Sequence, residues 1–404
     1  MELPQTRRRI LYDPPAPLVL AVCALILCLR RAGAVTHPQF WAEDAYLFEN
    51  AYEFGWHAFT IPFAGYFHTA LRAIAQLAVS VDPARAPWIF LACSSAVTLY
   101  VAGLALSPRC PLPRFCGTAA LAVVLVPDTF EVLLTVVNLQ WVIGAGMVLL
   151  LILGDARGPR QNTHDLAAAA AMGLTGPFCI MLSPLFVARA WARRSRASAF
   201  LAAVVVACAL VQGWCFLTSP ALGDAAAGAH FAPRVVLPAI GRRVGGSLLV
   251  GALLSADTDL YVGTLVGIGT LLGVAYLAFT KGPRRSERMM LGLAFLLLLA
   301  AALYRLRYKF DEAFIPGSAS RYFYIPQLVL MWLLIAAAGL KGRVGRLAPA
   351  LLAWAVLVNA PRYRERAFVD MHWSLYEASI REGRPIIVPV NPPGWIMPLP
   401  ARRR

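Results

Sequence analysis

Long apolar runs constrain the fold of this chain more than any other feature of its sequence. They recur from residue 16 to residue 360, and most have the length of a membrane-spanning helix, which needs roughly 17–25 apolar residues. Of the 404 residues, 59% are hydrophobic and 14% are charged, whereas soluble domains carry about a quarter charged residues. Irregular backbone cannot face lipid, and the short alternating strands of a barrel do not occur. We therefore expect an all-α, polytopic transmembrane helical bundle.

Basic residues between the apolar runs predict how the bundle is oriented. The net charge is +16, but most of it lies in short connections, where Lys and Arg mark the cytoplasmic side. No basic domain with interleaved aromatic residues is present, which excludes a nucleic-acid-binding function. We place the N-terminus in the cytoplasm and residues 32–85, 218–258, 305–320 and 361–404 outside. The expected location is a bacterial inner membrane, with the functional face toward the periplasm or exterior.

About 11 spans, some of them half-spans, account for the apolar runs. The run 165–190 lies between two segments assigned to the cytoplasm, so a single span does not fit it. Thr175-Gly176-Pro177 interrupt the run, and two half-spans that rise and return as a V resolve the conflict. The full spans are expected near residues 16–29, 86–106, 115–130, 132–153, 198–217, 259–280, 289–304, 322–340 and 347–360.

The spans belong to one transmembrane domain, residues 1–360, followed by a short external tail, residues 361–404. The first external segment includes an amphipathic stretch over residues 66–81. The tail is rich in turn formers and apolar residues, and we expect it to pack back on the external face.

Cysteine and histidine usage gives no indication of a metal site or a disulfide framework. The eight cysteines form no CxxC pair, and no Cys/His spacing typical of zinc occurs. The six histidines are scattered; His57 and His68 lie near the first external loop and are interpreted as surface residues. No cofactor is expected, and a requirement for a divalent metal stays open.

Two adjacent carboxylates, Glu43 and Asp44, follow the first apolar run. Such a pair is often no more than two solvated loop charges. Here Trp41, Tyr46 and Phe48 surround it, and aromatic residues that hold a loop on a membrane surface desolvate its carboxylates in part. Desolvation raises the pKa of a carboxylate and favours its use as a general base. We therefore favour a functional interpretation.

The acidic loop, the long external segments without spans and the broken V together resemble the GT-C superfamily of membrane glycosyltransferases. The chain looks like poorly characterised bacterial members with a W-x-E-D-G opening followed by P-x-x-G-Y and R. Ala45 stands where that pattern has glycine. The resemblance covers most of the chain as topology, but its sharp motif is confined to the first external loop. The matching residues are Trp41, Glu43, Asp44, Pro62, Gly65, Tyr66 and Arg72.

The resemblance implies transfer of a sugar from a polyprenyl-phosphate donor to a glycan or glycolipid acceptor. Asp44, aided by Glu43, would deprotonate an acceptor hydroxyl that attacks the anomeric carbon from the face opposite the phosphate, with inversion. Which of the two carboxylates is the base stays open.

A lipid-phosphate leaving group needs a cationic partner, and arginine binds phosphate oxygens with both ends of its fork. Arg321 is ranked first because it begins a span. Arg305, Arg307 and Lys309 are further candidates, and the alternative for these three is snorkelling to lipid head groups.

Polar and aromatic side chains near the outer ends of spans are the remaining substrate-binding candidates. Polar groups inside a span are costly and often functional, although they also join helices to one another without any substrate. In the tail, Asn391 and Trp395 suit sugar contacts, with a structural cap as the alternative. The further candidates are Trp41, Tyr66, Arg72, Glu131, Asn138, Gln140, Trp141 and Tyr322.

Two other functions fit a polytopic membrane protein. A transporter or flippase of a lipid-linked sugar would carry ionisable groups near the bilayer midplane, between repeated helices. A lipid-linked glycan polymerase or ligase would use external arginines without a first-loop acidic pair. The acids lie at span ends and no internal repeat is visible, which favours the transferase.

Overall fold

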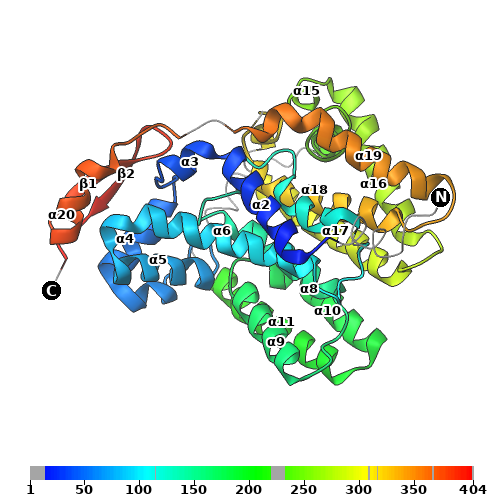
Figure 1. Ribbon diagram of the computed structural model, residues 1–404, viewed down its shortest axis with the longest axis horizontal. Helices are drawn as coiled ribbons and strands as arrows, with labels where there is room; N and C mark the ends of the chain where they lie inside the picture. The colour runs from blue at the N-terminus through cyan, green and yellow to red at the C-terminus, as the bar shows by residue number, and fades with distance from the viewer. Residues whose placement is uncertain are drawn as a thin grey trace.

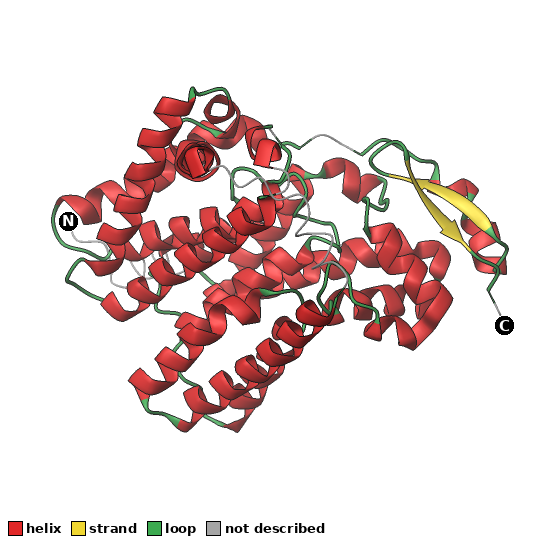
Figure 2. Ribbon diagram, turned by 180° about the vertical axis from the view of Figure 1, so that it is seen from behind, coloured by secondary structure: helices red, strands yellow, loops and turns green. Residues whose placement is uncertain are grey.

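The computed structural model describes residues 14–113, 115–219, 233–307, 310–315, 317–365 and 368–402 and is mostly helical (Figure 1, Figure 2). The longer helices are α2 (Ala16–Arg30), α4 (Asp44–Phe54), α5 (Thr69–Val81), α6 (Ala86–Ala105), α8 (Leu139–Ile152), α9 (Pro159–Gly173), α10 (Phe178–Arg193), α11 (Arg196–Thr218), α16 (Leu260–Phe279), α17 (Arg285–Leu306), α18 (Ser320–Ala337) and α19 (Arg343–Asn359). The short helices are α3 (Ala32–Thr36), α7 (Thr118–Val124), α13 (Val236–Ile240), α14 (Ser247–Leu249), α15 (Ala252–Ala256) and α20 (Glu377–Glu382). The short 3₁₀ helices are η1 (Gly55–Thr60), η2 (Pro83–Arg85), η3 (Phe115–Gly117), η4 (Pro233–Val235), η6 (Phe310–Phe314), η7 (Ala360–Tyr363) and η8 (Trp373–Leu375), and η5 (Gly241–Gly246) is a π-helix.

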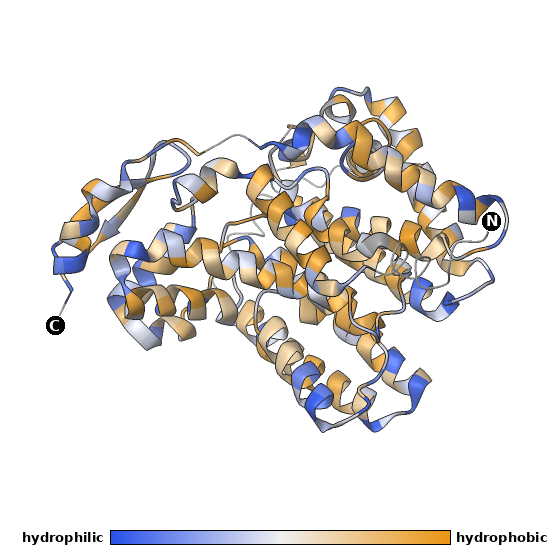
Figure 3. Ribbon diagram, in the orientation of Figure 1, coloured by the Kyte–Doolittle hydropathy of each residue, from blue (hydrophilic) through white to orange (hydrophobic). Residues whose placement is uncertain are grey.

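Six helices in the described part of the chain are long and apolar enough to cross a membrane: α6, α11, α16, α17, α18 and α19. Each lies where a full span was predicted, and Figure 3 shows that apolar residues dominate them while hydrophilic residues gather in the connections. Three shorter apolar helices, α2, α5 and α8, accompany them. A membrane-embedded helical bundle is therefore confirmed by helix length and composition.

The span predicted over residues 115–130 is wrong. Helix α7 ends at Val124, and the chain runs irregularly until α8 begins at Leu139. Pro127 lies in this stretch, and proline has no N–H to continue a helix. The buried side chain of Arg30 takes over the freed carbonyls, because its Nη1 donates to Val124 O at 2.7 Å and to Val126 O at 2.9 Å. The span predicted over 132–153 is shortened at its start, because α8 begins only at Leu139.

The predicted break in the run 165–190 is confirmed. Helix α9 ends at Gly173 and α10 begins at Phe178. The far ends of both helices return to one place, since Arg189 and Arg193 of α10 each contact Asp155, just before α9, at 2.9 Å. Helix α11 packs against both arms of the V (Figure 1).

The tail forms a β-hairpin that the helical prediction did not include. Strands β1 (Ile386–Val390) and β2 (Trp395–Leu399) pair antiparallel, in a register from Ile386–Leu399 to Val390–Trp395. The hairpin lies at one end of the molecule beside α4 (Figure 1, Figure 2). Asn391 N donates to Phe40 O at 3.2 Å, so the tail packs back on the segment that precedes the acidic pair, as expected.

A buried ion cluster fixes the start of the tail to the end of α2. Glu365 contacts Arg30 Nη2 at 2.9 Å and Arg31 Nε at 2.6 Å, and all three side chains are at most 5% exposed. Thr129 also donates to Glu365 at 2.6 Å. The cluster therefore joins α2, the irregular segment 125–138 and the tail.

We predict that Glu365→Gln destabilises the protein by about 3–5 kcal/mol, because removal of one partner leaves buried arginine charges uncompensated. Thermal unfolding in detergent measures the change, and limited proteolysis reports release of the tail. The matched control is Glu382→Gln, whose side chain is 53% exposed and whose loss is expected to change stability by less than about 0.5 kcal/mol. Equal melting of the two variants contradicts the prediction.

Candidate functional site

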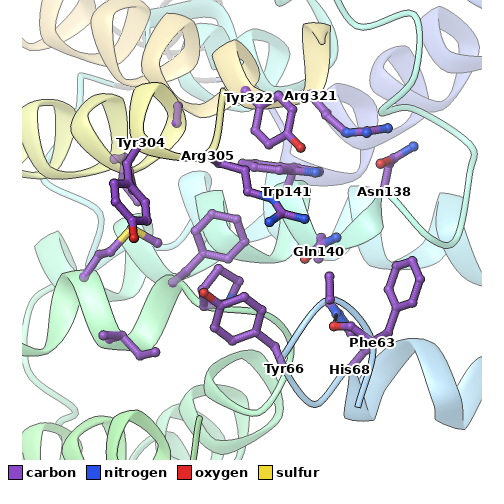
Figure 4. Close-up of a pocket in the computed structure, with 18 of the residues that line it drawn as sticks. Phe63, Tyr66, His68, Asn138, Gln140, Trp141, Tyr304, Arg305, Arg321 and Tyr322 are labelled. Carbon is purple, nitrogen blue, oxygen red and sulfur yellow. Dashed lines mark hydrogen bonds between the residues drawn. The ribbon is translucent and has the colours of Figure 1, made fainter. Parts of the chain in front are cut away.

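One cavity of about 340 Å³ brings together most of the predicted site residues (Figure 4). Its walls come from the turn 63–68, from segment 137–141 and from helices α10, α11, α17 and α18. The predicted residues that line it are Glu43, Tyr66, Asn138, Gln140, Trp141, Arg305, Arg307, Arg321 and Tyr322. Asp44, Trp41, Arg72, Glu131, Asn391 and Trp395 do not line it, and Lys309 lies outside the described residues.

The turn of the P-x-x-G-Y motif builds one wall of the cavity. Phe63 and Tyr66 exchange both backbone hydrogen bonds, at 2.9 and 3.1 Å. Ala64 and Gly65 between them have φ of +51° and +86°, as a two-residue hairpin turn of type I′ requires. The ring of Tyr66 stacks on Phe216 with centroids 5.1 Å apart. The motif thus forms a tight turn, and this turn presents Tyr66 to the cavity.

The break in the V holds this turn in place. Gly176 N donates to Phe67 O at 3.0 Å, and Ala70 N donates to Thr175 Oγ1 at 3.1 Å. From α11, the amide of Gln212 accepts from Phe67 N and donates to Phe67 O, both at 2.9 Å. The interrupted run and the P-x-x-G-Y motif, far apart in the sequence, are therefore parts of one structural unit.

The two adjacent carboxylates have different surroundings. Glu43 is half-buried and lines the cavity. Asp44 is only 3% exposed; its Oδ1 accepts from Val137 N at 2.6 Å and its Oδ2 from Trp41 N at 3.2 Å. Burial raises the pKa of Asp44 to about 7, against the lowering effect of these N–H groups. Asp44 therefore holds backbone, and of the two carboxylates between which the choice of base was left open, Glu43 is the one that lines the cavity.

Arg321 has an acidic partner. Its Nη1 lies 3.0 Å from Glu131 Oε2, and Glu131 itself sits behind the cavity wall. Burial raises the pKa of Glu131, while Arg321 lowers it. Asn138 Nδ2 donates to Glu131 O at 2.7 Å, which fixes the segment that carries the acid. Glu43 lies near enough to influence this pair, so Glu43 and Arg321 line the cavity together while Glu131 contacts Arg321 from outside the lining.

Two more arginines line the cavity. Arg305 lies in the last turn of α17 and Arg307 directly follows the helix; Arg307 Nη1 donates to Tyr304 O at 2.6 Å. Arg305 has no carboxylate partner among the described residues and extends toward Trp141 and Gln140 (Figure 4). Burial raises the pKa of Tyr66 to about 12, although Arg305 opposes the shift. Tyr66 therefore stays a neutral hydroxyl beside this arginine.

Aromatic and aliphatic side chains form the rest of the wall. Trp141 packs edge-on against Phe178 and Tyr322, with centroids 5.2 Å apart in each case. Its buried Nε1 has no partner among the described residues, which leaves one N–H donor at the cavity. Further along, the wall is apolar over α10, α11 and α17, through Ile180, Met181, Phe216, Leu298, Ala301 and Ala302.

Several predicted contact residues have structural roles instead. The ring of Trp41 stacks on Phe368, with centroids 5.1 Å apart. Asn391 is buried and binds Val369 N at 3.0 Å and Val369 O at 2.9 Å. Trp395 is exposed on the hairpin. The described residues contain no group of three or more His, Cys, Asp or Glu side chains that could hold a metal ion.

His68 was misread as a surface histidine. It is 3% exposed and lines the cavity, and burial lowers its pKa to about 4. Its ring lies 5.7 Å from that of Phe63. The available signal was its position two residues after Tyr66 and four before Arg72, which places it at the junction of the motif and the amphipathic helix.

Comparison with known proteins finds no matching family model, no matching curated protein and no matching solved structure.

We predict that the stability contributed by Asp44 is greatest in acid. Its pKa of about 7 in the folded state lies above the ordinary aspartate value of 3.8, so the folded state binds the proton more tightly than the unfolded chain does. The stability from this proton therefore falls as pH rises from about 4 to 7, at up to about 1.4 kcal/mol per pH unit. Unfolding in detergent at pH 5, 6, 7 and 8 measures it. Asp44→Asn should flatten the profile, whereas Asp370→Asn on the surface should not; unchanged slopes in both reject the shift.

Proposed function

We propose that this chain is a membrane glycosyltransferase that moves a sugar from a polyprenyl-phosphate donor to an acceptor hydroxyl at the external face of a bacterial inner membrane. One observation carries the proposal: a single cavity is lined by a carboxylate, Glu43, by Arg305, which has no acidic partner among the described residues, and by an apolar wall between helices. A lipid phosphate that carries a sugar has the complementary parts, namely an anion, a polar ring and a long apolar chain.

Glu43 is proposed as the general base. As the acceptor oxygen attacks the anomeric carbon, its proton passes to the carboxylate, and the bond to the phosphate breaks on the opposite face. Partial burial suits this task because it weakens hydration of the carboxylate. Asp44 acts through Glu43, because its hydrogen bonds to Trp41 N and Val137 N fix the start of α4.

Arg305 replaces Arg321 as the first candidate for the phosphate. The charge of Arg321 is balanced by Glu131 at 3.0 Å, whereas Arg305 keeps its charge for a ligand. Arg307 lines the same cavity and donates to Tyr304 O at 2.6 Å. Cations aimed at a developing phosphate charge stabilise the transition state, and the apolar wall over α10 and α17 suits the adjoining lipid chain.

The remaining polar groups of the cavity suit a bound sugar. Asn138 and Gln140 offer donors and acceptors, and Trp141 offers an indole N–H beside its ring. A volume of about 340 Å³ is at the lower end of the range for ligand pockets, roughly 300–1,000 Å³. That volume favours one sugar with its phosphate over an oligosaccharide.

We expect Glu43→Gln to abolish transfer while the protein still reaches the membrane, with a loss of about 100-fold or more. Mass spectrometry of surface glycans from a deletion strain that carries each variant measures the missing sugar. Glu49→Gln is the matched control, because Glu49 lies on the same helix but faces the tail hairpin. A glycan that keeps its sugar in the Glu43→Gln strain rejects Glu43 as the general base. Uptake or flipping of a lipid-linked sugar without its transfer supports the transporter or flippase instead.

We expect Arg305→Gln to weaken binding of undecaprenyl phosphate by at least about tenfold, since a hydrogen bond to a charged group is worth roughly 1.5–3 kcal/mol. Binding of the uncharged alcohol undecaprenol should not change. Titration of the purified protein with both lipids measures the two affinities. Arg85→Gln, on a 73% exposed side chain, is the control. Equal losses for both lipids reject a phosphate contact.

A further inference from the structure

Polar side chains follow one side of α5 from the cavity to the surface. His68 precedes the helix, and Arg72, Gln76 and Ser80 follow at intervals of four residues, which places them on one helical face. His68, Arg72 and Gln76 are 3%, 1% and 7% exposed, whereas Ser80 is exposed. Gln76 Nε2 donates to Ser80 Oγ at 3.3 Å. This α5 polar row spans about 18 Å at the rise of a helix.

The row carries buried polar atoms that the protein leaves unpaired. His68 Nδ1, Arg72 Nε and Nη1, and Gln76 Oε1 have no hydrogen-bond partner among the described residues. Arg72 Nη2 donates to Ile61 O at 3.2 Å, and the side chain of Tyr46 is a second hydrogen-bond partner of the guanidinium. Buried polar groups without a protein partner are normally satisfied by ordered water, and a buried charge without one is costly. Unpaired atoms on three successive members of the row offer hydrogen-bonding partners for bound waters at three successive positions.

Helix α4 brings the proposed base to the start of this row. Glu43 and His68 both line the cavity. One turn further along α4, the ring of Tyr46 lies 5.3 Å from the guanidinium of Arg72. Burial lowers the pKa of His68 to about 4, so its ring is neutral. With Nε2 donating to Phe63 O at 3.2 Å, Nδ1 is left as an acceptor for water.

We propose that the α5 polar row holds a chain of waters that carries the proton taken up by Glu43 to the external surface at Ser80. This role rests on the proposed function. The acceptor O–H proton goes to Glu43 as the new C–O bond forms, and the phosphate leaves with the electron pair of the broken C–O bond. Glu43 then gives the proton to the first water, the last water releases one at Ser80, and Glu43 returns to a carboxylate.

Hydroxyl-radical labelling of the intact protein in detergent tests the waters without any substrate. Gln76→Met keeps the length of the side chain and removes its amide; Leu77→Met, on the outer face of α5, is the matched control. We expect labelling of Tyr46 to fall several-fold in Gln76→Met alone, with the fully buried ring of Phe48 as the unlabelled reference. Equal labelling of Tyr46 in wild type and Gln76→Met overturns the water chain.

Transfer rates in H₂O and D₂O test the proton role. We expect Gln76→Met to lower kcat by about tenfold and to change the solvent isotope effect, with KM unchanged and with Gln76→Glu restoring the rate. The proton role is overturned if the Gln76→Met variant shows reduced labelling of Tyr46 but keeps the kcat and the solvent isotope effect of the wild type. If the wild-type protein transfers no sugar, the proposed function is rejected, and with it the source of the proton. The labelling experiment tests the water chain independently of that result.

Discussion

The buried carboxylate of Asp44 is the constraint on which the geometry of the cavity depends. It binds Val137 N at 2.6 Å and Trp41 N at 3.2 Å, and so joins the start of α4 to an irregular segment nearly a hundred residues away in the sequence. That segment forms isolated turns, such as the one closed by Val132 N and Thr129 O at 2.8 Å, instead of a continuous helix. The tie places Glu43 in the lining of the cavity and, through the same segment, brings Asn138 to its wall. The catalytic proposal for Glu43 therefore depends on a neighbour that does not touch the cavity.

Buried arginines solve a related problem elsewhere in the bundle. Where a helix ends in apolar surroundings, its last carbonyls need donors that lipid cannot supply. Arg30 serves the carbonyls after α7, and Arg189 donates to Leu150 O at 2.6 Å and Leu153 O at 2.9 Å after α8. Arg243 donates in the same way to Ile315 O at 3.1 Å and Ser318 O at 2.7 Å. Part of the positive charge is therefore internal, and only the remainder can mark membrane orientation.

Whether a feature could be predicted from the sequence depends on how far apart in the sequence the interacting residues lie. Apolar length places α6, α11 and α16 to α19, and Thr175-Gly176-Pro177 place the break in the V, because these signals are local. The course of residues 125–138 could not be read, because it is set by Arg30 and Asp44 from distant parts of the chain. The same limit explains the ranking of Arg321: a sequence gives the cation but not Glu131, its partner at 3.0 Å.

The distribution of charge in the cavity bears on the stereochemistry of the proposed reaction. An inverting displacement needs its base and its leaving group on opposite faces of the anomeric carbon. Glu43 lies near the neutralised pair of Arg321 and Glu131, whereas Arg305 lies near Tyr66. If both cations served the phosphate, Arg321 would draw the leaving group toward the base. The pairing of Arg321 with Glu131 removes this competition between the two arginines for the phosphate. The ion pair would therefore favour one orientation of the donor in the cavity without contacting the lipid.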